Sequence, residues 1–274
     1  GASGIGRAMA ERFAAAGMKI VLADIESAVL EATAKQMRAA GAAIHTQLTD
    51  VSDGSAADAL AANTLAHFGA VHIVCNNAGV ATAGPVWTMT EADWQFTIGV
   101  NLWGVIHGVR AFAPTMIEQD EGHFVNTASM AGLVSMPGMG AYNVTKQGVV
   151  ALTETLFEDL RSQGSNVGAS VLCPAFVNTK IWDSQRNRPD ALKNEAGKGD
   201  SETYESSKST LKEVIEHAMP AAKVVDAVHD AVLANQLYIL THSSSQESVR
   251  KRMGHIVAGE NPTQGSPDLQ SLLN

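Results

Sequence analysis

Short apolar segments of strand length alternate with helical segments along most of this chain. The strand-like segments cover residues 18–24, 43–50, 71–76, 122–129, 167–174 and 236–241. Strands that alternate with helices in this way are typical of βαβ units, which build a parallel sheet. The alternation therefore predicts an α/β fold.

Composition and charge narrow the class of protein. The chain has 274 residues, of which 45% are apolar and 17% charged, and no linker or repeat divides it, so we predict a single domain over 1–274. The 28 acidic residues exceed the 19 basic ones by 9 without any dense basic stripe, so nucleic acid and anionic membranes are poor partners. Cys75 and Cys173 stand alone, which argues against a metal site and for a reducing compartment. With no apolar stretch of membrane-spanning length, we predict a cytoplasmic protein.

The sequence also shows where three helices start and which two segments lack a regular apolar pattern. The capping signals are Ser27 for a helix ended by Gly41, Ser55 with Asp58 for one ended before Gly69, and Thr90 with Asp93 for a third, long helix. Residues 180–217 are polar and lack regular apolar spacing, so we expect a mobile insertion there. Residues 259–274 contain Pro and Gly and are expected to form an extended arm.

A glycine-rich segment, Gly1-Ala2-Ser3-Gly4-Ile5-Gly6, leads into a helical segment. Glycines let backbone amides approach a pyrophosphate closely, and the N-terminus of the helix adds partial positive charge. The alternative is a tight loop that binds nothing. We interpret the segment as the dinucleotide-binding turn of a Rossmann-type, doubly wound parallel sheet. The central strand of such a sheet precedes the turn, so we expect a strand of about ten residues ahead of Gly1.

Asp24 ends the next predicted strand, about 20 residues after the glycines. A carboxylate there can accept hydrogen bonds from both hydroxyls of an adenosine ribose and would repel a 2′-phosphate. No Arg or Lys stands at Ser3 or directly after Asp24. The predicted cofactor is therefore NAD, the alternative being an aspartate that only ends a strand.

Five motifs occur in a fixed order between residues 1 and 179. They are residues 1–6 as the remainder of TGxxxGxG, Asp50-Val51, Asn76-Asn77-Ala78-Gly79, Asn101, and Ser129 with Tyr142-Asn143-Val144-Thr145-Lys146. Each is unremarkable alone, but a serine thirteen residues before YxxxK and after NNAG is a specific combination. In these motifs the chain resembles the short-chain dehydrogenase/reductase family, in its single-domain branch.

The resemblance implies a set of residues around the cofactor. They are Gly1, Ser3, Gly4, Ile5, Gly6, Asp24, Ile25, Asp50, Val51, Asn76, Ala78, Gly79, Pro174, Val177 and Thr179, together with Tyr142 and Lys146. Asp50 would accept from the adenine amino group, and the loop from Pro174 to Thr179 would contact the nicotinamide carboxamide. Ala175 stands where the family has glycine, which costs on the order of 1 kcal/mol if the position needs a positive φ.

The resemblance also implies that Asn101, Ser129, Tyr142 and Lys146 are catalytic. Tyr142 and Lys146 are four residues apart, so on a helix they share one face. An ammonium and an oxidised nicotinamide nearby would favour the phenolate, so we expect Tyr142 to transfer the proton with a pKa below that of a free phenol. Ser129 would hold the substrate oxygen, and Asn101 would kink its helix and fix a water that links Lys146 to solvent.

Apolar loops surround the expected reaction site. The predicted substrate-pocket residues are Met130, Ala131, Met136, Met139, Phe176 and Trp182, and residues 180–217 are expected to close over them as a lid. Such a pocket suits a bulky aromatic or alicyclic substrate, although loop packing without substrate contact is the alternative. The last third weakly resembles bacterial Cα-dehydrogenases of lignin-type aryl ethers and hydroxysteroid dehydrogenases.

These features predict an NAD-dependent oxidoreductase that interconverts a secondary alcohol and a ketone. The alternatives are a catalytically silent NAD-binding sensor or scaffold, which the intact catalytic set disfavours, and an epimerase or dehydratase of the longer branch of the superfamily. We also expect a homo-oligomer, either a tetramer or a dimer, with Trp94, Phe96 and Phe157 in the seam between subunits.

Overall fold

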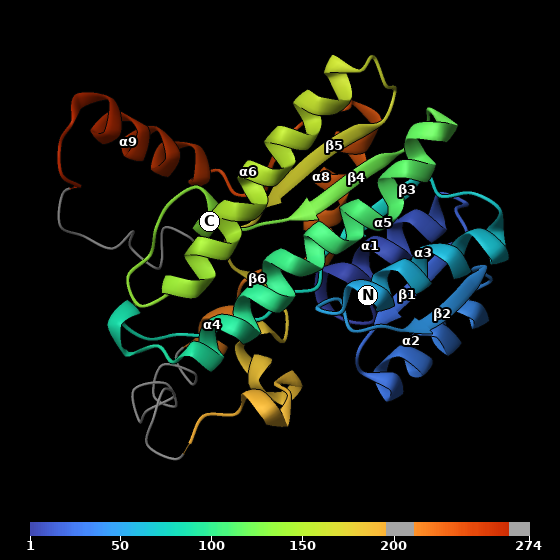
Figure 1. The fold of residues 1–274 in the computed structure, drawn as a ribbon, viewed down its shortest axis with the longest axis horizontal. Helices are drawn as coiled ribbons and strands as arrows, with labels where there is room; N and C mark the ends of the chain where they lie inside the picture. Colours follow the sequence, from blue (N-terminus) through green and yellow to red (C-terminus); the bar gives the residue numbers. More distant parts are fainter. Residues whose placement is uncertain (196–210, 263–274) are drawn as a thin grey trace.

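The computed structural model describes residues 1–195 and 211–262, and its core is a parallel sheet in two parts (Figure 1). One part has the order β3 (Ile73–Asn76), β4 (His123–Thr127), β5 (Gly168–Cys173) and β8 (Tyr238–Leu240). The other pairs β1 (Ile20–Asp24) with β2 (Ile44–Leu48), and all these pairings are parallel. The α/β prediction is confirmed, and each of the six strand-like segments contains an observed strand.

An apolar slot separates the two parts of the sheet. No strand of the described residues pairs with both β1 and β3, and a cavity of about 490 Å³ lies between them. Its lining includes Met9 and Phe13 of the first helix, Leu22 of β1, Val74 of β3 and Phe112. The slot lies where a doubly wound sheet has its central strand.

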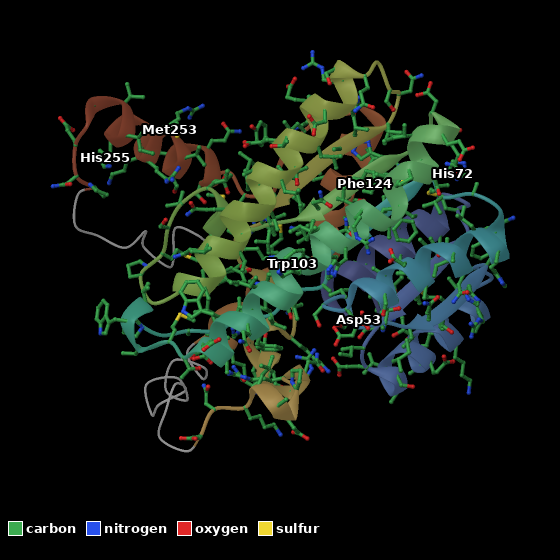
Figure 2. All side chains as sticks on the ribbon, in the orientation of Figure 1. Asp53, His72, Trp103, Phe124, Met253 and His255 are labelled. Atoms are coloured by element: carbon green, nitrogen blue, oxygen red, sulfur yellow. The ribbon has the colours of Figure 1, made fainter. Side chains whose placement is uncertain are left out.

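Helices cover both faces of the sheet. On one face lie α1 (Gly4–Ala15), α2 (Ser27–Ala39) and α8 (Ala221–Leu233), and on the other α3 (Gly54–Phe68), α5 (Gly104–Gln119) and α6 (Gly140–Ser162). Successive strand residues supply the two cores. Val125 of β4 packs toward α1 and α8, whereas Phe124, which Figure 2 labels on β4, packs toward α5 and α6.

The predicted helix ends are partly confirmed. Helix α4 (Glu91–Ile98) starts with a full capping box between Thr90 and Asp93, as expected. Gly69 ends α3 in the left-handed conformation, with φ +82°.

Two predicted caps were wrong. Asp53, not Ser55, caps α3, because its carboxylate accepts from the Ser55 amide two residues later. Asp58 instead pairs with Arg110 of α5. Ser27 is the first residue of α2 and makes no capping bond.

Short elements connect the layers. They are η1 (Val86–Thr88), the π-helical turn η2 (Gly99–Trp103), η3 (Met130–Gly132), β6 (Val177–Asn178), η4 (Ile181–Asn187), η5 (Asp190–Leu192), β7 (Met219–Pro220) and the projecting α9 (Ser245–Ala258). The expected insertion thus forms two short 3₁₀ helices in its first part, while residues 196–210 lie outside the described residues. So do residues 263–274, which hold most of the expected arm. Across the two described ranges, no helix combines the length and apolarity needed to cross a membrane.

Candidate active site

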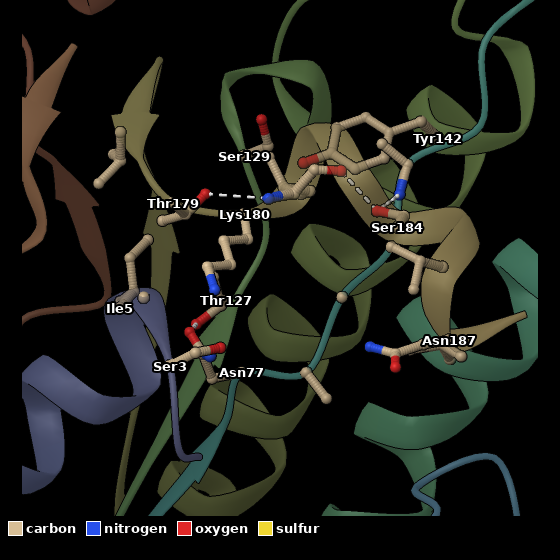
Figure 3. A pocket seen from close by; sticks show the side chains of 18 of the residues that line it. Ser3, Ile5, Asn77, Thr127, Ser129, Tyr142, Thr179, Lys180, Ser184 and Asn187 are labelled. Carbon is tan, nitrogen blue, oxygen red and sulfur yellow. Dashed lines mark hydrogen bonds between the residues drawn. The ribbon is translucent and has the colours of Figure 1, made fainter. Parts of the chain in front are cut away.

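A cavity of about 460 Å³ opens at the carboxyl ends of the strands and brings most predicted site residues together (Figure 3). The predicted cofactor residues in its lining are Gly1, Ser3, Gly4, Ile5, Asp24, Ile25, Asp50, Val51, Ala78, Gly79, Pro174, Val177 and Thr179. The predicted pocket and catalytic residues in its lining are Met130, Met136, Met139, Phe176, Ser129, Tyr142 and Lys146. One continuous cavity therefore joins the glycine turn to the catalytic motif.

Five predicted residues do not line this cavity. The side chain of Asn76 points toward α5, where it abuts Gly108 and donates to Asn126 Oδ1 at 2.9 Å, so its neighbour Asn77 lines the cavity instead. Gly6 supports the glycine turn from behind, since a Cβ there would lie 2.8 Å from Asn77 Nδ2.

The other three are Ala131, Asn101 and Trp182. Ala131 and Asn101 are fully buried behind the cavity. Trp182 packs under Lys212, whose Nζ lies 5.0 Å from the ring centroid.

The glycine turn is shaped for close backbone approach. A Cβ on Gly1 would lie 2.8 Å from the carbonyl oxygen of Ala23, and Gly4 adopts φ +53°, which disfavours any other residue. Helix α1 begins at Gly4, so its first amides border the cavity. Such a turn fits a pyrophosphate group at the N-terminus of the helix.

The carboxylate of Asp24 is fixed at the same end of the cavity. Its Oδ2 accepts from the backbone nitrogens of Gly1 and Ala2, each at 2.9 Å, and its Oδ1 accepts from the Glu26 amide at 3.0 Å. Burial by itself raises the pKa of Asp24, but the Gly1 nitrogen and the hydrogen bonds from the Ala2 and Glu26 amides oppose this, and the pKa lies below its ordinary value. Asp24 is therefore a carboxylate at neutral pH.

Ser129, Tyr142 and Lys146 meet at the other end, where Figure 3 shows Ser129 beside Tyr142. Tyr142 and Lys146 share one face of α6, with Lys146 Nζ 5.7 Å from the centroid of the phenol ring. Lys146 Nζ donates to the Thr127 carbonyl at 2.8 Å. Ser129 Oγ accepts from the Ala131 amide at 3.2 Å, which orients its hydroxyl at the end of β4.

Burial shifts the pKa values of Tyr142 and Lys146 in opposite directions. Burial raises the pKa of Tyr142, and the hydrogen bond from Ser129 opposes this only in part. Burial also lowers the pKa of Lys146 to about 8, because a buried ammonium loses its hydration. The expected lowering depends on the Lys146 ammonium together with an oxidised nicotinamide, so it stays a prediction for the protein with its cofactor bound. Further positive charge in the cavity is needed to favour the phenolate.

Asn101 has a more specific structural role than the sequence indicated. It lies in η2, so the expected distortion of the long helix is a π-helical turn. Its Oδ1 accepts from the Val80 amide at 2.8 Å, and its Nδ2 donates to the Val80 carbonyl at 2.9 Å and to Thr145 Oγ1 at 3.2 Å. Asn101 therefore ties the loop after β3 to the catalytic helix. The water relay stays a prediction.

The loop after β5 is held by a histidine that the sequence did not reveal. The Ala175 amide donates to His242 Nδ1 at 3.3 Å, and His242 Nε2 contacts the Phe176 carbonyl at 3.2 Å. Ala175 is not among the residues with positive φ, so the expected strain at this position is not found. No motif surrounds His242, and it lies 67 residues from Ala175.

Residues 180–195 form a cover over the cavity, which we call the roof. Ser184 lines the cavity and accepts from the Ala81 amide at 2.9 Å through its Oγ. Arg188 forms a buried ion pair with Asp93 of α4, at 2.7 Å between Nη1 and Oδ1. The guanidinium of Arg188 also lies 5.6 Å from the ring of Phe96. Phe96 is 3% exposed and lines the cavity, so its predicted place in a subunit seam was wrong.

Comparison with known proteins agrees with this geometry. The family model for the short chain dehydrogenase matches residues 1–190. The chain belongs to the short-chain dehydrogenase family. It is therefore an oxidoreductase with a Rossmann-like fold, and the family binds NAD(P).

Relatives cover nearly the whole of this short-chain dehydrogenase. A short-chain dehydrogenase/reductase from Burkholderia phymatum, solved in complex with NAD, is 46% identical, with a TM-score of 0.94 over 97% of this chain and 95% of that one. The "CLA biosynthesis dehydrogenase/reductase" of Lactiplantibacillus plantarum is 31% identical over 99% of this chain and 94% of its own length. The "C alpha-dehydrogenase" of Sphingobium sp. (strain SYK-6) is 32% identical over 98% and 87%.

Proposed function

We propose that the protein is an NAD-dependent dehydrogenase that interconverts a secondary alcohol and a ketone. The observation that carries this proposal is one cavity that holds Ser129, Tyr142 and Lys146 at one end and the glycine turn with Asp24 at the other. A bound dinucleotide would contact both ends, with its adenosine near Asp24 and its nicotinamide near Tyr142. The tight approach of Gly1 to Ala23 and the α1 N-terminus fit the cofactor's pyrophosphate.

In the proposed reaction, Tyr142 accepts the proton of the alcohol and Ser129 holds the same oxygen by a hydrogen bond. The bound nicotinamide supplies the hydride acceptor, and its positive charge in the oxidised form is what the phenolate needs. Lys146 adds charge near the phenol and would hold the nicotinamide ribose, while Asn101 keeps the Val80 loop against the catalytic helix. In the reverse direction Tyr142 returns the proton to the oxygen of the ketone.

The substrate is proposed to be bulky and hydrophobic, aromatic or alicyclic. Met130, Met136, Met139 and Phe176 line the catalytic end of the cavity, and methionine side chains adapt to irregular apolar shapes. The name of the 32% identical C alpha-dehydrogenase supports an oxidation at a carbinol carbon. A preference for NAD over NADP is supported by the ionised Asp24 and by the NAD complex of the relative from Burkholderia phymatum.

An assay tests this function directly. Purified protein is incubated with NAD and a panel of aryl and alicyclic secondary alcohols, and NADH formation is followed by fluorescence. We expect turnover of at least one bulky alcohol and a higher kcat/KM with NAD than with NADP. If no alcohol of the panel is oxidised and no corresponding ketone is reduced, the proposed reaction is wrong. A higher kcat/KM with NADP than with NAD would disprove the proposed role of Asp24.

We further propose a homo-oligomer, a dimer or tetramer, in a reducing cytoplasm. Trp103, at the junction of η2 and α5, is 49% exposed, and Val144 on α6 is 52% exposed, so apolar side chains lie on the helices that we expect to pair (Figure 2). Cys75 and Cys173 are free, and burial raises the pKa of each thiol to about 12. A strictly monomeric mass by light scattering at micromolar concentration would contradict the oligomer.

A further inference from the structure

The carboxylate of Glu26, two residues after Asp24 at the end of β1, joins the roof to the adenosine end of the cavity. Glu26 Oε1 accepts from Arg186 Nη2 at 2.8 Å, from Arg186 Nε at 3.1 Å and from Asn187 Nδ2 at 3.0 Å. All three residues line the cavity, and Glu26 lies 160 residues from Arg186 in the sequence. This contact brings a guanidinium to the adenosine end, where the sequence showed no basic residue.

Arg186 is held in place independently of Glu26. Its Nη1 donates to the carbonyls of Lys180 at 3.0 Å and of Asp183 at 2.9 Å, within the turn that carries it. The remaining edge of the guanidinium, Nε with Nη2, faces Glu26. Such an edge offers two parallel donors, which is the arrangement that binds a phosphate by two hydrogen bonds.

Glu26 also lies next to the ribose carboxylate. Its amide donates to Asp24 Oδ1 at 3.0 Å, so the two side chains leave the chain two residues apart at the end of β1. Burial raises the pKa of Glu26, but hydrogen bonds from Arg186 and Asn187 outweigh this and lower it overall. At neutral pH Asp24 and Glu26 are therefore both carboxylates, and Glu26 already engages the guanidinium of Arg186.

We propose that Glu26 is a specificity-determining residue for the cofactor, because it occupies the edge of Arg186 that would otherwise bind a 2′-phosphate. This inference rests on the proposed use of NAD. It makes the preference for NAD depend on two carboxylates with different actions. Asp24 repels the 2′-phosphate, and Glu26 occupies the guanidinium of Arg186, which could otherwise bind that phosphate.

Four proteins test this proposal: the wild type, Glu26→Gln, Arg186→Met and the double variant. The readouts are the dissociation constants of NADH and NADPH, measured by nucleotide fluorescence without substrate, and kcat/KM with NAD and NADP. Glutamine keeps the length of the side chain and removes its charge. We expect Glu26→Gln to strengthen NADPH binding at least about tenfold, and we expect this gain to vanish in the double variant, where no guanidinium remains.

Two results would overturn the proposal. One is unchanged NADPH binding in Glu26→Gln. The other is an equal gain in the double variant, which would mean that loss of a negative charge suffices. Glu11→Gln is the matched control, because this substitution also removes one negative charge. Glu11 pairs with Arg7 on the surface of α1 and does not line the cavity. Since nucleotide binding is measured without turnover, a protein that binds both nucleotides but oxidises no alcohol would disprove the proposed reaction and leave this test intact.

Discussion

The catalytic end of the cavity and its roof are stabilised in different ways. We call Asn101, Ser129, Tyr142 and Lys146 the floor. All four are at most 9% exposed. Ser129 lies just after β4, before η3, Tyr142 and Lys146 lie in α6, and Asn101 lies in the π-helical turn. The roof is built from two short 3₁₀ helices and is attached through charged side chains. Its inner attachment, Arg188 to Asp93, is buried, whereas the outer one, Arg186 to Glu26, has side chains that are both 27% exposed.

This difference indicates that the floor determines the catalytic step and that the roof determines which ligands bind. Buried groups in a rigid layer keep the proton-transferring atoms at fixed distances, which catalysis requires. A cover attached by a few polar contacts can change with the ligand, and its residues reach both the adenosine end and the catalytic end. We therefore expect changes in the floor to act mainly on kcat and changes in the roof to act mainly on binding.

The largest expected effect comes from the floor. Tyr142→Phe removes the phenolic hydroxyl and keeps the packing of the ring, so kcat should fall by roughly 10²–10⁴ while the NADH dissociation constant stays nearly unchanged. Steady-state kinetics and nucleotide fluorescence measure the two quantities. A much smaller loss in kcat would show that Tyr142 has only a structural role.

The next effect comes from the inner attachment of the roof. Arg188→Met leaves Asp93 buried without its cation, which typically costs about 3–5 kcal/mol. We expect a lower thermal midpoint and a higher KM for the alcohol, with kcat less affected.

The same experiment has two controls. Adding Asp93→Asn should restore much of the loss, because asparagine can still accept from the Thr90 amide in the capping box and carries no charge. Arg110→Met breaks the exposed pair with Asp58, whose side chains are 54% and 52% exposed, and should cost less than about 1 kcal/mol. Equal losses in the two single variants would contradict a buried anchor.

The pH dependence of stability should distinguish the sheet from the roof. Burial lowers the pKa of His123, at the start of β4, to about 4 from 6.5, so the unfolded chain binds a proton more readily than the folded one. His123 therefore stabilises the fold fully above pH 6.5, and this contribution is lost as the pH falls toward 4, by on the order of 3 kcal/mol.

The contribution of Asp93 is also lost on acidification, but in a lower pH range. Burial raises its pKa, but hydrogen bonds from Thr90, Asn194 and Arg188 outweigh this and lower it below 3.8. Its contribution is present above pH 3.8 and is lost only below that value. Urea unfolding between pH 7 and 4 should therefore show a loss that His123→Gln reduces and that Arg110→Met, in the exposed pair with Asp58, leaves unchanged. If the free energy of unfolding of His123→Gln depends on pH as that of the wild type does, His123 is not the source of the loss.

The smallest expected effect is at Thr90, which caps α4 and also donates to Asn194 Oδ1 of the roof at 2.7 Å. Thr90→Ala should cost about 1 kcal/mol in the free energy of unfolding. Thr90→Ser keeps both hydrogen bonds and should recover most of this energy. A loss above that of Arg188→Met would reverse the proposed ranking of the two contacts.

The floor could be predicted from the sequence because its signals are local. The spacing of Tyr142 and Lys146 already places both side chains on one face of a helix, and Ser129 ends an apolar run. At Asn76, an error of one position was enough to make the prediction wrong. Neighbouring residues at a strand end point to opposite faces, so a shift of one position assigned Asn76 the place that Asn77 occupies.

The roof could not be predicted in this way. Its contacts with the rest of the protein join residues 95 to 161 positions apart, such as Arg188 with Asp93 and Asn187 with Glu26, and polar pairs leave no periodicity in the sequence. The capping residue of α3 was missed for a related reason. Asp53 and Ser55 are both good caps, and only the backbone conformation decides which one bonds to the free amides.

The most direct test of this account follows the transferred hydrogen. A bulky secondary alcohol that carries deuterium on its carbinol carbon is incubated with NAD and either the wild type or Tyr142→Phe, and the nicotinamide product is analysed by mass spectrometry. We predict deuterated NADH from the wild type and almost none from the Phe variant, although both proteins bind NADH equally well. Deuterium transfer at similar rates in both proteins, or none in the wild type with any alcohol of the panel, would contradict the account.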